Sequence, residues 1–197
     1  MQIELRRIQR EVNITFVYVT HDQEEAMSMS DRVAVMRNGN FEQIGSQQEI
    51  FERPRTRFVA EFMGASNIFS GRATAVSGGP ANSASTDTIH IETDTGFALF
   101  SRNNREIPSG AAISFSIRPE AVQVFPQGWD WQGDNKFEGK ITEKVYLGDV
   151  TELELTLAGE NSVVSRVQSR LDQEFGFKKG DSVLVGWDAE DCNLLSD

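Results

Sequence analysis

The sequence is poor in the residues that build most metal and redox centres. It has one cysteine, Cys192, and two histidines among 197 residues. A single cysteine forms no internal disulfide and no thiolate cage for a metal, which argues against a small secreted scaffold and fits a reducing compartment. We therefore expect a cytoplasmic protein, and we assign it no metal-ligating residues.

Long apolar runs and an excess of positive charge are also missing. No stretch approaches the ~18 consecutive apolar residues of a membrane-spanning helix. The amino terminus lacks the basic-then-apolar order of a signal peptide. Nineteen Lys and Arg stand against thirty Asp and Glu, and the resulting formal charge of −11 repels phosphate backbones and anionic lipid surfaces. We therefore expect no nucleic acid among its partners.

The first third of the chain alternates helix and strand patterns. Apolar residues at helical spacing predict an amphipathic helix over residues 1–12, and because no N-cap precedes it, we expect a truncated chain. Residues 14–19 (ITFVYV) are β-branched and aromatic without polar alternation, which is typical of a strand buried on both faces of a parallel sheet. Few sheet neighbours are present, so we expect the exposed strand edge to promote pairing between chains.

Local signals predict the remaining elements of this part. Asp22 is placed to cap a helix, and Asn38-Gly39 favours a type I′ turn between two strands. Ser46 opens a capping box ahead of a short helix. Thr56 can cap a last helix, which Gly64 ends.

After Gly64 the helical periodicity gives way to short alternating runs separated by Gly, Asn, Asp and Pro. Their spacing favours an all-β barrel or sandwich, so the class is α+β overall, with an incomplete α/β part followed by an OB-like β part. This second part contains 11 basic and 20 acidic residues, which is most of the negative charge. We expect loops at 77–88 and 126–135. The predicted strands are 68–76, 89–93, 97–100, 113–117, 122–125, 137–147, 153–157, 163–167 and 183–187.

His21 is the first candidate for a functional residue. It follows the predicted buried strand and precedes a helix start, and open α/β sheets bind ligands at the carboxyl ends of their strands. Beside a helix amino terminus, an imidazole can donate a hydrogen bond to a phosphate oxygen and help to place an attacking water. The alternative is a histidine that only bonds the backbone at a strand end.

Ordered segments in both parts of the chain carry a family resemblance. They are YVTHDQEEAM (18–27), SDRVAVM (30–36), NG (38–39), QIG (43–45), IFERP (50–54), NIFSG (67–71), IRPE (117–120), YLG (146–148) and 180–187. The segments up to residue 54 resemble the end of the ATP-binding subunit of an ABC importer. The later segments resemble the transport-associated OB-like (TOBE) domain that follows the ATPase core in these subunits, and the ending at 186–195 is most similar to subunits that serve polyamine (spermidine/putrescine) uptake.

The resemblance implies a role for His21 and a set of partners. His21 corresponds to the switch-loop histidine, a catalytic residue that contacts the ATP γ-phosphate in a nucleotide-sandwich dimer. The full-length protein would use ATP and Mg²⁺, pair with a second copy of itself and dock on transmembrane permease subunits at the inner face of the membrane, which it meets only through them. Residues 1–64 would be the C-terminal part of the nucleotide-binding domain, and residues 65–197 the TOBE domain.

Other parts of an ATPase are missing from this sequence. A P-loop needs G-x-x-x-x-G-K-[ST], and around Gly139-Lys140 the first glycine and the final hydroxyl residue are both replaced. No Asp-Glu pair follows an apolar strand, and Ser77-Gly78-Gly79 only mimics a signature loop. We therefore expect this chain alone to be inactive and to bind no cofactor. The alternative is a stand-alone regulatory or small-ligand-binding OB-like module.

Four further features have ordinary structural explanations. His90 alternates with apolar residues, so we expect a solvent-facing strand residue rather than a ligand. Trp129 and Trp131 form either an exposed contact or an anchor that packs a loop onto the barrel. Arg118 can bind an anion, but pairing with a nearby acid is the simpler hypothesis. Lys178-Lys179 is predicted to be a solvated turn.

Overall fold

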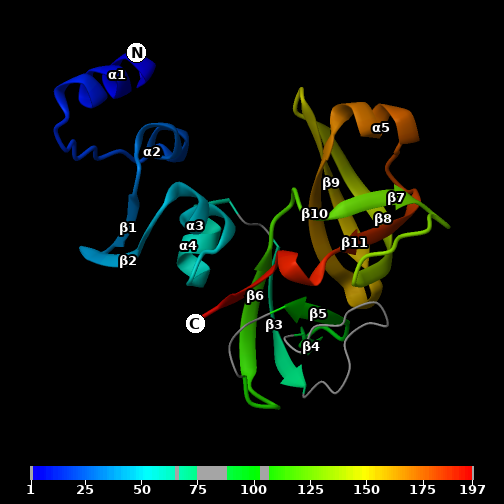
Figure 1. Cartoon of the computed structure of the whole chain (residues 1–197). Helices are drawn as coiled ribbons and strands as arrows, with labels where there is room; N and C mark the ends of the chain where they lie inside the picture. The colour runs from blue at the N-terminus through cyan, green and yellow to red at the C-terminus, as the bar shows by residue number, and fades with distance from the viewer. Residues whose placement is uncertain (1, 65–66, 75–87, 103–106, 197) are drawn as a thin grey trace. The chain divides into compact units, whose positions relative to one another are not determined.

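The computed structural model describes residues 2–64, 67–74, 88–102 and 107–196 (Figure 1). The chain divides into two compact units, Met1–Met63 and Gly64–Asp197, each with a hydrophobic core of its own. The predicted loop at 77–88 lies outside the described residues except for its last residue, as does Ser77-Gly78-Gly79. In the part of the chain that the structure describes, no helix is long and apolar enough to cross a membrane.

The described part of the first unit consists of short helices and one antiparallel hairpin. Val35, Ile50, Val59 and Met63 form its core. The predicted amphipathic helix at the amino end is confirmed. The elements of the unit are α1 (Gln2–Val12), α2 (Gln23–Met29), β1 (Val33–Arg37), β2 (Asn40–Gly45), α3 (Gln47–Glu52) and α4 (Arg57–Phe62).

Turn and cap residues set the element boundaries as predicted. Asn38 and Gly39 have φ values of 51° and 81°, the left-handed conformation that a type I′ turn needs between β1 and β2. At the start of α3, the Ser46 hydroxyl accepts the Glu49 N–H at 3.2 Å while the Glu49 carboxylate accepts the Ser46 N–H at 2.8 Å. Thr56 caps α4 in the same way through one bond.

The predicted buried strand at residues 14–19 is wrong. These residues form an irregular connection between α1 and α2, and the side chains of Val17 and Val19 are 88% and 90% exposed. A parallel strand needs a partner on at least one edge, and β1 and β2, the strands described in this unit, pair only with each other. The predicted pairing between chains through this segment therefore loses the strand edge on which it rested.

The second unit consists of two curled five-stranded antiparallel sheets, which confirms the mostly β, OB-like prediction for this part (Figure 1). One sheet has the strand order β10-β9-β8-β11-β7 and the other β12-β6-β3-β4-β5. The strands are β3 (Asn67–Thr74), β4 (Thr88–Thr93), β5 (Ala98–Arg102), β6 (Ala112–Ile117), β7 (Gln123–Pro126), β8 (Asn135–Tyr146), β9 (Val150–Leu157), β10 (Asn161–Gln168), β11 (Ser182–Trp187) and β12 (Cys192–Leu195).

One continuous apolar core lies between the two sheets of this unit. Inward-facing residues of both sheets contribute to it, among them Phe115 of β6 and Ile141 of β8. Phe137 of β8 contacts Phe97 edge to face at 5.5 Å and stacks on Trp187 at 4.8 Å, so aromatic rings bridge the sheets.

Two buried asparagines tie the sheets together through their side-chain amides. Asn67 of β3 donates to the Val164 carbonyl and accepts the Val164 N–H, both at 2.7 Å. Asn135 of β8 accepts the Phe100 N–H at 2.7 Å and donates to the Phe100 carbonyl at 2.9 Å. Both asparagines are 2% exposed. Each side-chain amide bonds the N–H and the carbonyl of one residue in the other sheet, as a backbone amide does within a sheet.

One α-helix and one short strand of the second unit are absent from the sequence prediction. The helix α5 (Ser169–Phe175) is fastened by Asp172, which is buried and accepts from Lys144 Nζ at 2.6 Å and from the Thr151 hydroxyl at 3.2 Å. The strand β12 has only four residues and pairs with β6. The helix α5 depends on polar tertiary contacts rather than on a periodic apolar pattern. The strand β12 is too short to show an alternating pattern in the sequence.

Replacing Asn67 by Asp should destabilise the second unit by at least about 2 kcal/mol, because an acceptor and a charge would face the Val164 carbonyl in a buried position. Urea unfolding followed by tryptophan fluorescence measures this unit, since Trp129, Trp131 and Trp187 all lie in it. The exposed Gln123→Glu change on β7 is the matched control and should stay within about 0.5 kcal/mol of the parent. Equal stabilities of the two variants would contradict the prediction.

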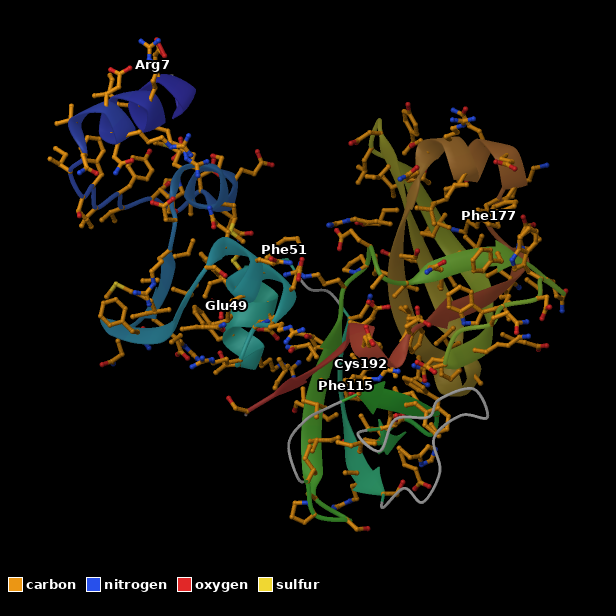
Figure 2. The ribbon with its side chains drawn as sticks, in the orientation of Figure 1. Arg7, Glu49, Phe51, Phe115, Phe177 and Cys192 are labelled. Atoms are coloured by element: carbon orange, nitrogen blue, oxygen red, sulfur yellow. The ribbon has the colours of Figure 1, made fainter. Side chains whose placement is uncertain are left out.

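Cys192 should resist thiol reagents in the folded chain. Its side chain lies at the start of β12 (Figure 2), is 2% exposed, and burial strongly raises the pKa of the thiol. The reactive thiolate is therefore scarce near neutral pH. We expect labelling by a chromogenic disulfide reagent only after unfolding in urea. Labelling of the folded chain at the rate of a free cysteine would disprove this.

Candidate functional site

His21 lies at a backbone bend just before α2. Its side chain is exposed, and the next residue, Asp22, is the N-cap of the helix. The order of connection, histidine and helix is the predicted one, although no strand leads into it. The imidazole is thus exposed to solvent at the end of the segment that joins α1 to α2.

The residues around His21 are joined by hydrogen bonds to the first turn of α2. The Glu25 carboxylate accepts from the Tyr18 hydroxyl at 3.0 Å and from the Thr20 hydroxyl at 2.9 Å, both on Oε2. The Asp22 N–H donates to the Thr20 hydroxyl oxygen at 2.9 Å. The hydrogen bond to Glu25 is the main cause that raises the pKa of Tyr18 above its usual value.

The amino end of α2 is negatively charged. The Asp22 carboxylate accepts the N–H groups of Glu24 and Glu25 at 2.9 and 3.2 Å, so these donors are already used. Three carboxylates, those of Asp22, Glu24 and Glu25, lie within this turn. Contact with a phosphate at this position would therefore depend on the imidazole of His21 itself.

Polar side chains of other elements set the position of α2. None of its residues is buried, although Met27 packs against the apolar core of the unit. Arg6 of α1 donates to the Ser28 carbonyl at 3.0 Å, and Gln47 of α3 donates to the carbonyls of Met27 and Ser30. Gln23 donates to the Phe62 carbonyl at the end of α4. The helix that carries the His21 loop is thus placed by side chain to backbone hydrogen bonds.

Few described residues fit ATP or its metal ion. No cluster of three or more His, Cys, Asp or Glu side chains suited to a metal ion occurs among the residues that the structure describes. The sequence contains no P-loop motif. His21 is exposed and can donate a hydrogen bond to a phosphate oxygen, but the carboxylates beside it repel a polyanion.

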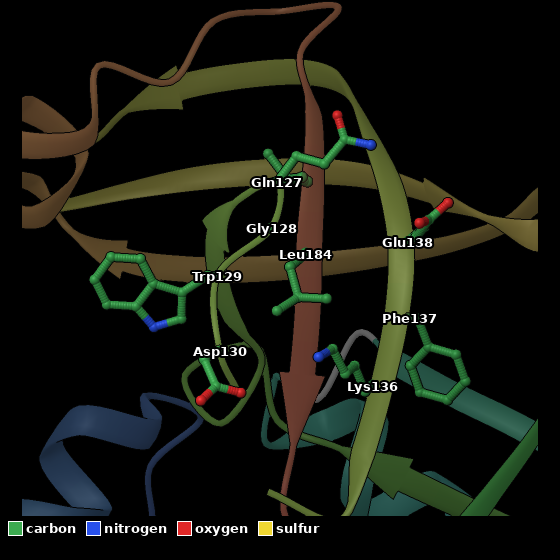
Figure 3. Close-up of a pocket in the computed structure, with 9 residues that line it drawn as sticks. Gln127, Gly128, Trp129, Asp130, Lys136, Phe137, Glu138 and Leu184 are labelled. Carbon is green, nitrogen blue, oxygen red and sulfur yellow. The ribbon is translucent and has the colours of Figure 1, made fainter. Parts of the chain in front are cut away.

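A hollow of about 350 Å³ opens on the second unit beside Trp129 (Figure 3). Trp129 is 46% exposed and stacks on Phe125 at 5.5 Å with the rings nearly parallel. Asp130, Glu138 and Lys136 stand around it, so both signs of charge meet there. We assign this hollow no ligand.

For Trp131 the structure distinguishes between an exposed contact and an anchor that packs the loop onto the barrel. Trp131 is half-buried, its indole N–H donates to the Asn135 carbonyl at 3.1 Å, and its ring contacts Phe125 at 5.4 Å. A Cβ on Gly186 would come within 3.0 Å of the Trp131 ring, so the glycine makes room for the indole. Trp131 is therefore the loop anchor, while Trp129 keeps an exposed face.

The other residues singled out from the sequence have structural partners. His90 lies in β4 with intermediate exposure, where the Thr74 hydroxyl is 2.7 Å from Nδ1 and the Phe100 ring packs beside the imidazole. The turn after Ile117 is tied to β10, because Arg166 pairs with Glu120 at 2.9 Å. At the predicted turn, Lys179 pairs with Glu143.

The fold of the second unit defines its class. Residues 115–195 match the TOBE domain family. A solved structure described as the cytoplasmic molybdate-binding protein ModG superimposes on this chain with a TM-score of 0.57. That alignment covers 66% of this chain and 96% of the other at 20% sequence identity, which supports the fold alone. The second unit thus has an OB-like fold, and its residues 115–195 match the TOBE domain.

Curated relatives extend the similarity to the first unit. Spermidine/putrescine import ATP-binding proteins PotA of Rubrobacter xylanophilus and Thermobifida fusca are 37% and 39% identical over 99% of this chain. PotA of a Nostoc species is 42% identical over 75% of it. The chain spans about half the length of the curated relatives it matches, 48% for the first two. The predicted resemblance to the C-terminal part of ABC importer ATP-binding subunits is confirmed, and nothing supports the separate ligand-binding module.

Replacing Asp22 by Ala should loosen the first turn of α2. Loss of an N-cap carboxylate costs about 1 kcal/mol, so amide hydrogen exchange at Glu24 and Glu25 should accelerate about fivefold. Asp22→Ser keeps a capping oxygen and should stay close to the parent. Unchanged exchange at both amides in the Ala variant would show that the cap contributes nothing.

Proposed function

We propose that this chain is the C-terminal half of the ATP-hydrolysing subunit of an ABC importer whose cargo is a polyamine of the spermidine/putrescine class. The observation that carries the proposal is the similarity over 99% of the chain to the Rubrobacter and Thermobifida import ATP-binding proteins. The TOBE match at 115–195 supports the same conclusion from a second direction. Residues 1–64 then end the nucleotide-binding domain, and residues 65–197 are the TOBE domain.

In this proposal His21 acts on the nucleotide. ATP, bound with Mg²⁺, supplies the γ-phosphate that is transferred to water. His21 donates a hydrogen bond from its imidazole to a γ-phosphate oxygen, which stabilises charge on that group during transfer. The exposed imidazole at a tethered backbone bend supports this role. The carboxylates of Asp22 and Glu24 mean that this loop needs a phosphate cradle from elsewhere in the full-length protein.

The second unit has an interaction or regulatory role in the proposal. Its partners are a second copy of the chain and the permease subunits, through which the protein reaches the inner face of the membrane from the cytoplasm. The cargo binds other subunits, so no residue of this chain is assigned to the polyamine. The acidic surface of this unit, with 20 acidic and 11 basic residues, accords with the absence of nucleic acid among the proposed partners.

The test is a chimera in which this chain replaces the corresponding half of the Thermobifida fusca relative. We expect the chimera to hydrolyse ATP and His21→Ala to lower kcat by about 100-fold or more, with ATP binding retained, because one donor to the transition state is lost. His90→Ala is the matched control and should keep the parent kcat. The isolated chain should show no ATP turnover.

Two results would contradict the proposal. A chimera that folds and binds ATP but hydrolyses none would exclude this chain as the missing half. Equal kcat values for the parent chimera and its His21→Ala variant would remove His21 from the reaction.

A further inference from the structure

Three hydrogen bonds close a ring around His21. The Thr20 hydroxyl donates to Glu25 Oε2 at 2.9 Å, and the Asp22 N–H donates to the Thr20 oxygen at 2.9 Å. The Glu25 N–H completes the ring by donating to Asp22 Oδ1 at 3.2 Å. His21 is the one residue between Thr20 and Asp22, so both of its backbone neighbours belong to the ring.

A second donor strengthens the carboxylate corner of this ring. The Tyr18 hydroxyl donates to the same oxygen of Glu25 at 3.0 Å. Glu25 is half-buried, and it thereby fixes the chain at two points, one and three residues before His21. Hydrogen bonds to an ionised carboxylate are about twice as strong as those between neutral groups.

Apolar packing does not order this segment. Val17 and Val19 are almost fully exposed, and α2 has no buried residue. Without tethers, each residue of such a connection regains backbone conformational entropy. The ring of Thr20, Asp22 and Glu25 is therefore the described structure that restricts the backbone on both sides of His21.

We propose that Glu25 is a positioning residue, which holds the backbone of His21 through Thr20 and Tyr18 so that the imidazole is presented in one orientation. This catalytic consequence rests on the proposed function, whereas the ring itself does not. Glu25 does not act on substrate in this scheme. Its Oε2 accepts hydrogen bonds from the two hydroxyl groups, and the negative charge of the carboxylate strengthens these bonds.

The first test uses the chain as it is. Glu25→Ala should open the ring, so amide exchange at Asp22 should accelerate about fivefold for the loss of one hydrogen bond. The pKa of Tyr18 should fall towards that of a free tyrosine, because Glu25 is the main cause that raises it. Ultraviolet titration resolves this, since the chain has two tyrosines and Tyr18→Phe identifies the signal of Tyr146.

Two variants serve as controls. Glu25→Gln keeps an oxygen acceptor for both hydroxyl groups and removes only the charge. Exchange at Asp22 should therefore stay near the parent, and the pKa of Tyr18 should fall by less than in Glu25→Ala. Glu24→Ala removes the adjacent carboxylate, which is exposed, and should change neither measurement. If Glu25→Ala left the exchange at Asp22 and the pKa of Tyr18 unchanged, the ring would be dismissed.

The second test measures catalysis in the chimera. Glu25→Ala should lower kcat by about 10- to 100-fold with the KM for ATP unchanged, because a misplaced catalytic group costs rate rather than binding. Glu25→Gln should recover most of the loss. Failure of recovery despite normal exchange at Asp22 would overturn the positioning role, since the charge itself would then be needed. A chimera without ATPase activity contradicts the proposed function, and the exchange and titration results still decide whether the ring exists.

Discussion

Two amide side chains determine how the sheets of the second unit meet. The apolar core between the sheets is large, but burial of apolar surface is not directional and tolerates sliding. Asn67 and Asn135 are almost fully buried, and each must bond both a donor and an acceptor of one residue on the opposite sheet. A slip of one residue would leave these groups without partners, so the amides select one register that the core alone would not define.

The first unit relies on a different balance of forces. Its apolar core is small, and α2 contributes no buried residue to it, although Met27 packs against it. Donor side chains on α1, α3 and the start of α2 itself reach carbonyl groups and thereby place the helix. The loop that contains His21 thus precedes a helix, α2, that hydrogen bonds hold in place. The segment before this loop exposes Val17 and Val19 to solvent. Such a loop can change conformation without disturbing the packed core beside it.

Local chemistry was predictable from the sequence, and long-range polar contacts were not. The turn at Asn38-Gly39 and the cap at Ser46 depend on neighbouring residues only, and both were correctly predicted. The prediction of a strand at residues 14–19 was wrong because its apolar pattern is typical of a buried strand, which forms only where another strand pairs with it. At the candidate site the order of residues and the family resemblance indicate His21. Spacing alone suggests that Glu25 reaches back to the Asp22 N–H, yet in the structure its carboxylate bonds Tyr18 and Thr20 instead.

The absence of buried side chains on α2 has a consequence for sequence variation in this chain. Most surface positions of the helix contact no core, so substitutions there change charge and solubility more than geometry. The side chains that place the helix donate to its backbone carbonyls, which every amino acid provides. Selection for the orientation of the loop therefore acts at a distance, on Arg6 and Gln47, whose side chains have no substitute of equal reach and donor geometry among the apolar residues. Among related sequences we therefore expect the exposed positions of α2 to vary and the residues at Arg6 and Gln47 to be conserved.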